Sequence, residues 1–182
     1  MNSGWANPAV IGLMGFGMTT MVTGLSNVSS LHIGGTPVLA LALIWGGTAQ
    51  FLAGFVALMK GNIFAGSAFV GYGSFWIALF LMLYVVGGVA GNDLLAFWFV
   101  WTLFTFTFLI NAWKHGPGIF GVFLFLFIAY LLLDAVAASN AAAGSTLTTL
   151  AGYEIFFDGL LAWYVATAIE VESHYGRKIL PH

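Results

Sequence analysis

Charged residues are scarce in this chain, which has 182 residues, only 5% of them Asp, Glu, Lys or Arg. A soluble domain usually carries about a quarter charged residues, because its surface must stay hydrated. Hydrophobic residues make up 61% of the chain, so we expect lipid rather than water to surround most of its surface. The four Lys and Arg residues and the net charge of −2 leave no basic footprint for binding nucleic acid.

Cysteine is absent, which excludes disulfides, thiolate metal sites and cysteine nucleophiles. The four histidines fall in predicted loops or tails, without metal-ligand spacing and without a candidate nucleophile beside them: His32, His115, His174 and His182. The sequence also lacks the glycine-rich loops that bind nucleotides. We therefore expect no metal, no cofactor and no enzymatic activity.

Long apolar runs, in contrast, fill most of the sequence. A hydrocarbon core about 30 Å thick needs roughly 20 apolar residues in a helix. Six runs approach or exceed that length, at 8–28, 37–59, 66–89, 94–113, 119–138 and 147–169. They are continuous rather than alternating, which argues against a transmembrane barrel. The sequence predicts an all-α integral membrane protein, with residues 1–182 forming a single six-helix transmembrane domain.

The two ends of the chain and its basic residues indicate how it is inserted. Residues 1–6 carry no basic residue, and the first run is long enough to span, so we expect no cleavable signal peptide. The basic residues follow the second, fourth and sixth runs: Lys60, Lys114, Arg177 and Lys178. With six spans they share one side, which the positive-inside rule assigns to the cytoplasm. We expect a multi-pass protein of the cell membrane with both termini cytoplasmic.

The chain also shows a faint internal repeat of about 55 residues. Phe16 in the first run is flanked by two glycines, and Tyr72 in the third run has the same neighbours. Lys60 and Lys114 are separated by a similar interval, and one further step from Tyr72 reaches Leu126 in the fifth run. The pattern predicts three two-helix repeats, whose odd helices surround a pseudo-threefold axis. Its glycines also suit close helix packing in lipid.

If the repeat holds, Phe16, Tyr72 and Leu126 lie at equal depth around one axis. A narrow apolar ring can gate by dewetting, passing a small, partly dehydrated solute and stopping hydrated ions. The Tyr72 hydroxyl could then bond a carboxylate oxygen. The alternative is that these side chains fill the core or face lipid, as aromatic residues in a chain with 17% aromatics often do. We interpret them as a pore constriction.

Polar residues within the runs are candidates for the wall of a substrate path, since each needs a partner or water. Gln50 and Thr105 lie at similar distances before Lys60 and Lys114, which predicts similar depths. Asn7 precedes Pro8 and either caps the first helix or helps to bind an anion there. Further candidates, for which hydrogen bonding to their own helix is the alternative, are Thr19, Thr20 and Ser74.

Acidic residues gather near the fifth and sixth runs. Asp134 lies late in the fifth run, while Glu154 and Asp158 are one helical turn apart early in the sixth. Close carboxylates repel each other when both are charged, so these three are candidates for handling protons. The alternatives are a solvated cluster at the outer interface or a contact between subunits.

Several of these motifs together resemble the acetate uptake transporter family, of the succinate–acetate permease (SatP) type. The resemblance covers nearly the whole chain and is carried by the segments at 7–9, 12–20, 46–50, 60–64, 72–76 and 175–181. It implies six-helix protomers assembled as a homo-hexamer, each with its own path for acetate and related small carboxylates such as succinate. It also implies a constriction at Phe16, Tyr72 and Leu126, with Gln50 and Asn7 on the wall of the path.

This sequence departs from the resemblance in two places. Val10 stands where the family motif often has a second proline, and the acidic residues near the last two runs are unusual. Transport could therefore be passive or proton-coupled. A channel for small neutral solutes, such as urea, short amides or ammonia, is the alternative function.

Overall fold

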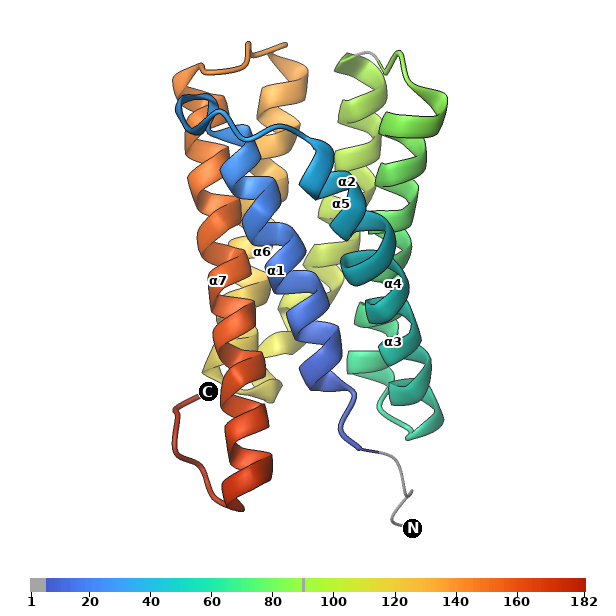
Figure 1. Ribbon diagram of the computed structural model, residues 1–182, viewed down its shortest axis with the longest axis vertical. Coiled ribbons are helices and arrows are strands. Elements are labelled where there is room, and N and C mark those ends of the chain that lie inside the picture. The colour runs from blue at the N-terminus through green and yellow to red at the C-terminus, as the bar shows by residue number, and fades with distance from the viewer. Residues whose placement is uncertain (1–5, 90) are drawn as a thin grey trace.

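The structure is a computed structural model that describes residues 6–89 and 91–182, so most of the leading segment and Ala90 in the loop after the third run lie outside it. Figure 1 shows long helices packed side by side into one bundle, with the start of α1 and the end of α7 at its lower end. All regular structure in the described residues is helical: α1 (Ala9–Asn27), α2 (Thr36–Leu43), α3 (Gln50–Met59), α4 (Ile63–Phe80), α5 (Gly91–Ala112), α6 (Pro117–Ala138) and α7 (Thr146–Tyr175).

Two of the membrane-crossing rods contain π-helical segments. The π-helix η2 (Ile44–Ala49) joins α2 to α3, so these three elements form one rod of 24 residues from Thr36 to Met59. A second π-helix, η3 (Leu81–Val86), extends α4 in the same way. Five rods are long and apolar enough to cross a membrane, and the sixth, α7, is the least apolar because it carries four carboxylates. The predicted all-helical membrane protein with six helical rods is confirmed.

Side chains at the helix ends explain where several rods begin. Asn7 accepts a hydrogen bond from the Ala9 N–H at 3.0 Å, and Asn62 accepts one from the Ala65 N–H at 3.0 Å. Ser145 accepts a bond of 3.3 Å from the Thr148 N–H at the start of α7. Each bond satisfies one of the N–H groups that lack a partner in the first turn of a helix.

Glycines let α1 and α7 touch along their backbones. A Cβ atom on Gly17 would lie 2.7 Å from the Gly159 carbonyl oxygen, and one on Gly24 would lie 2.6 Å from the Gly152 carbonyl oxygen. Both distances are shorter than carbon and oxygen allow, so only glycine permits this approach. Because dispersion contacts drive helix association in lipid, the close fit of α1 on α7 is a main packing surface of the bundle.

Aromatic rings fill the space between α4 and α5. The Tyr72 ring lies 5.2 Å from that of Phe104, and the Phe75 ring lies 5.1 Å from that of Trp101, each edge to face. Such pairs are a favoured arrangement of aromatic rings. Large apolar side chains also cover the outside of the bundle, as the exposure of Phe55, Leu103 and other residues indicates. A surface of this kind suits lipid.

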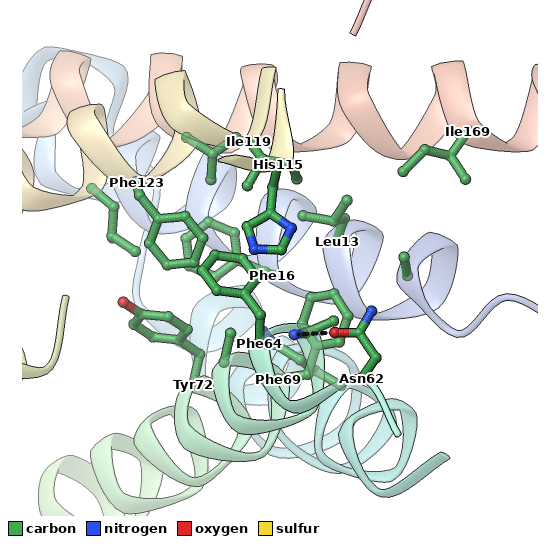
Figure 2. A pocket seen from close by; sticks show the side chains of 16 residues that line it. Leu13, Phe16, Asn62, Phe64, Phe69, Tyr72, His115, Ile119, Phe123 and Ile169 are labelled. Carbon is green, nitrogen blue, oxygen red and sulfur yellow. Dashed lines mark hydrogen bonds between the residues drawn. The ribbon is translucent and has the colours of Figure 1, made fainter. Parts of the chain in front are cut away.

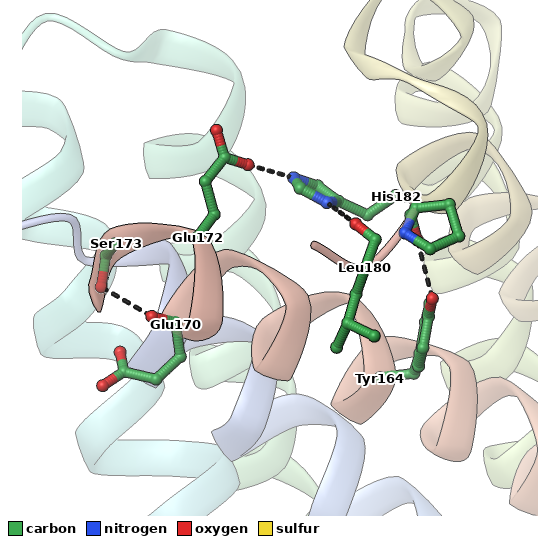
Figure 3. A network of polar contacts seen from close by, with 7 residues as sticks. Tyr164, Glu170, Glu172, Ser173, Leu180 and His182 are labelled. Atoms are coloured by element: carbon green, nitrogen blue, oxygen red, sulfur yellow. Dashed lines mark hydrogen bonds and ion pairs between the residues drawn. The ribbon is translucent and has the colours of Figure 1, made fainter. Parts of the chain in front are cut away.

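After α7 the chain turns back at the lower end of the bundle (Figure 1), and Figure 3 shows the polar contacts of this tail. The Tyr164 hydroxyl donates a hydrogen bond of 2.9 Å to the Pro181 carbonyl oxygen. His182 Nε2 lies 3.3 Å from a carboxylate oxygen of Glu172. These contacts hold the tail beside the turn between α5 and α6, where the backbone of His182 lies against Gly118.

Candidate functional site

Two cavities lie one above the other inside the bundle. The lower cavity has a volume of about 170 Å³ and reaches Ala9 and Asn62 at the lower end of the bundle. The upper cavity has a volume of about 360 Å³ and reaches Asn27 at the opposite end of α1. The side chains of Phe16 and Leu126 line both cavities. These two residues therefore form the septum between the lower and upper cavities.

Phe16, Tyr72 and Leu126 come from α1, α4 and α6, and all three side chains are almost completely buried, at 4%, 3% and 5% exposure. The ring centroids of Phe16 and Tyr72 lie 5.6 Å apart, with the ring planes tilted by 54°. Tyr72 lines the lower cavity, where Figure 2 shows it across the same space from Phe16. The three predicted constriction residues are thus gathered at the boundary of the cavities.

Tyr72 also makes the polar contact that joins α4 to α5. Its hydroxyl oxygen lies 2.8 Å from the Thr105 hydroxyl oxygen, and either group can donate. Thr105 is fully buried and lines neither of the two cavities among the described residues. Its contact with the lower cavity is therefore indirect, through the Tyr72 side chain, and its predicted place on the wall of the substrate path stays a prediction.

Gln50 lies on the wall of the lower cavity at the start of α3 and is only 1% exposed. Its side-chain oxygen is buried without a hydrogen-bond partner in the described residues. The π-helix η2 ends immediately before it, and the Gln50 Cβ lies 3.4 Å from the position that a Cβ on Gly15 would take. Gln50 therefore faces the lower cavity beside Gly15, the residue that precedes Phe16. Single-turn π-helical segments occur frequently at functional sites.

Asp158 on α7 lies at the depth of the septum. It precedes Gly159, whose backbone contacts Gly17, and Gly17 follows Phe16. The Asp158 side chain is 0% exposed, and neither of its oxygens has a hydrogen-bond partner in the described residues. Glu154, one turn nearer the upper end, also has two buried oxygens without partners. A buried polar group without a partner is costly, which makes this face of α7 a candidate for a functional role.

Asp134 differs from Glu154 and Asp158 because its carboxylate has a hydrogen-bond partner in the described residues. Its Oδ2 accepts a hydrogen bond of 2.7 Å from the Thr102 hydroxyl on α5. Thr102 Oγ1 is also 3.1 Å from the Trp98 carbonyl oxygen of its own helix. Asp134 therefore belongs to the contact between α5 and α6, and its predicted role in proton handling stays a prediction.

The other predicted path residues have different surroundings. Thr20 lines the upper cavity, and its buried hydroxyl has no hydrogen-bond partner in the described residues. Thr19 is buried beside Gly46 of η2 and lines neither cavity, while Ser74 donates a bond of 2.8 Å to the Val70 carbonyl of its own helix. Asn7 is exposed at the start of α1, outside the described lining of both cavities.

Sequence reasoning missed His115, which the structure brings into the lower cavity. This residue ends the short 3₁₀ turn η4 (Trp113–His115) between α5 and α6. Its ring stacks on Phe64 with the centroids 3.9 Å apart and the planes 20° from parallel. In the sequence it is one of several loop histidines. Its distinguishing signal is that it lies two residues after the end of the fourth apolar run.

A bundle of membrane-crossing helices that encloses two cavities, separated by an apolar septum, defines a helical membrane channel or transporter. The comparison with known proteins agrees with this class. The chain belongs to the GPR1/FUN34/yaaH family, whose model matches residues 1–176.

Two relatives and one solved structure show the extent of the similarity. The chain is 35% identical to the succinate-acetate/proton symporter SatP of Escherichia coli K12, over 99% of this chain and 96% of the symporter. It is 36% identical to an uncharacterized protein of Methanothermobacter thermautotrophicus, over 97% of this chain and 90% of that protein. The structure of the bacterial acetate channel SatP matches with a TM-score of 0.89 and 34% identity, covering 97% of this chain and 98% of that one.

Proposed function

We propose that this protein is a membrane channel or transporter for acetate and related small carboxylates such as succinate. The observation that carries the proposal is the pair of cavities that meet at Phe16 and Leu126. The similarity to a succinate-acetate/proton symporter and to an acetate channel supports the choice of solute.

The septum selects solutes by the cost of removing their water. A hydrated ion would lose most of its hydration shell between Phe16 and Leu126 and gain nothing in return, so it is stopped. Acetate carries a methyl group that suits an apolar passage and one charged end that needs hydrogen bonds. The Gln50 amide and the Tyr72 hydroxyl can donate such bonds on the lower side of the septum.

Coupling to protons is the role that we propose for the carboxyl groups near the path. Asp158 is the leading candidate because it lies at the same depth in the bundle as Phe16. Neither of its oxygens has a hydrogen-bond partner in the described residues. Glu154 lies one turn away and could pass a proton between Asp158 and the upper side. Asp134 is a third candidate at greater distance from the septum. A proton on one of these groups could accompany the anion across.

The assembly and orientation that we propose follow the sequence-based expectation. Six copies form a homo-hexamer in the cell membrane, and each copy has its own path.

The basic residues follow rods that end at the lower end of the bundle: Lys60, Lys114, Arg177 and Lys178. Basic residues favour the cytoplasmic side, so the lower cavity opens to the cytoplasm and both termini lie there. Native mass measurement in detergent should give six chains, and a stable monomer would contradict this assembly.

The purified protein in liposomes provides the test of the proposed function. Uptake of labelled acetate should exceed that of protein-free liposomes, and excess succinate should reduce it. Urea distinguishes the alternative function, because a path for small neutral solutes would carry labelled urea and be insensitive to succinate. Acetate uptake equal to that of protein-free liposomes would refute the proposal.

A further inference from the structure

The lower cavity contains an imidazole at its mouth. Figure 2 shows the His115 ring lying between Phe64 and the wall formed by Leu13 and Ile119, in the space that leads to Phe16. The stack on Phe64, with ring centroids 3.9 Å apart, covers one face of the imidazole. The edge that carries the ring nitrogens is left for other contacts. No hydrogen bond to either nitrogen occurs within the described residues.

The other described residues of the lower cavity carry no formal charge. Most are apolar, and the polar side chains besides His115 are those of Gln50, Asn62 and Tyr72. Asn62 uses its carbonyl oxygen to accept the Ala65 N–H, as described above. His115 is therefore the described lining residue whose side chain can carry a positive charge, since both ring nitrogens of a protonated histidine are donors.

We propose that His115 is a specificity-determining residue of the lower cavity, where its protonated ring binds the carboxylate of a solute before the solute reaches Phe16. This inference rests on the proposed function. His115 is exposed where the cavity opens, so water screens part of its charge, and the apolar walls on the inner side reduce the screening for an anion that enters. The stack on Phe64 limits the orientations of the ring and so keeps a nitrogen directed along the path. Neutral solutes gain little from the charge, so His115 favours anions over them.

Other charged groups lie around His115. A pH effect of His115 on transport has to be distinguished from an effect of these neighbouring groups. Lys114 precedes it in η4 and places its Nζ 5.7 Å from the Trp113 ring centroid. On the α3–α4 turn, the Lys60 Nζ donates a bond of 2.9 Å to the Ala6 carbonyl oxygen. The tail contributes His182, which pairs with Glu172 at 3.3 Å. His174 and His182 are the other histidines at this end of the bundle, and His182 is the control because its backbone lies against Gly116, the residue after His115.

The test compares the full-length wild-type protein in liposomes with His115→Gln, which keeps a hydrogen-bonding amide and removes the titratable charge. If the protonated form binds the anion, the half-saturating acetate concentration of the wild type should rise several-fold between pH 5 and 8, the range in which histidine side chains in general change charge. In His115→Gln it should be several-fold higher than in the wild type at the acidic end and equal at the alkaline end. Acetate itself changes protonation over this pH range, and it does so equally for both proteins. The half-saturating concentration of the variant is therefore divided by that of the wild type at the same pH.

Two further variants decide between a charge effect and a structural one. His115→Lys keeps a cation at all these pH values and should hold the half-saturating concentration low at pH 8. His182→Gln should retain the wild-type pH profile. An unchanged pH profile in His115→Gln, or an equal loss of urea and acetate flux, would overturn the role of His115. Absence of acetate uptake in the wild type would instead refute the proposed function.

Discussion

The hydroxyl oxygens of Tyr72 on α4 and Thr105 on α5 lie 2.8 Å apart in the interior of the bundle. Aromatic rings fill most of the space between these two helices, so this bond is the polar link that sets the position of the Tyr72 ring. One edge of the proposed constriction therefore depends on a residue that lines neither of the two cavities.

Removing the Thr105 hydroxyl should destabilise the protein and loosen the constriction. Thr105→Val keeps the shape of the side chain and leaves the Tyr72 hydroxyl without its partner, at a cost of about 1–3 kcal/mol. The midpoint of thermal unfolding in detergent should fall, and acetate flux should change with it. Thr105→Ser retains the hydroxyl and is the matched control. Equal unfolding midpoints for the wild type and Thr105→Val would contradict this prediction.

Truncating Phe16 should open the septum. Phe16→Ala removes a ring that lines both cavities, so flux of acetate and of larger carboxylates should rise several-fold while selectivity falls. Leu126→Ala should act in the same direction with a smaller effect, because it removes less volume. Phe125→Ala is the control, since that neighbouring side chain is 40% exposed on the outside of the bundle. If Phe125→Ala and Phe16→Ala change transport equally, the septum has been assigned to the wrong residues.

Adding a methyl group between α1 and α7 should strain the bundle. In Gly17→Ala the new Cβ would lie 2.7 Å from the Gly159 carbonyl oxygen, so the helices must move apart. Overpacking of this kind costs about 1–3 kcal/mol, which a lower unfolding temperature in detergent would report. Gly34→Ala meets nothing within 4 Å and should leave the unfolding temperature unchanged. A Gly17→Ala protein as stable as Gly34→Ala would show that α1 and α7 tolerate a wider separation.

Replacing Asp158 should separate proton-coupled transport from passive flow. Asp158→Asn keeps the size of the side chain and cannot carry a proton, so stimulation of acetate uptake by an inward proton gradient should fall several-fold. The measurement compares liposomes with and without the gradient, after subtraction of protein-free liposomes. Glu170→Gln is the control, because the Glu170 side chain is partly exposed beside His174 near the end of α7. Stimulation that persists unchanged in Asp158→Asn would mean that Asp158 carries no coupled proton.

The sequence by itself determined the class of fold. Six apolar runs and the scarcity of charged residues indicate that lipid surrounds the chain. The continuous apolar runs then predict a bundle of helices, because backbone N–H and C=O groups in lipid must form hydrogen bonds within their own helix. Pattern alone also selected Phe16, Tyr72 and Leu126, since similar surroundings in the sequence predict similar depth in a repeated structure.

Only the tertiary structure decided which side chains meet. Asp158 and Asp134 look alike in sequence, yet one is fully buried beside the septum and the other bonds Thr102 on a neighbouring helix. His115 looks like any loop histidine until the packing of η4 on Phe64 turns its ring into the lower cavity. The physical reason is that helix rotation and close approach set these contacts. These contacts depend on glycines and aromatic rings from segments that are far apart in the sequence. A local sequence pattern therefore does not predict them.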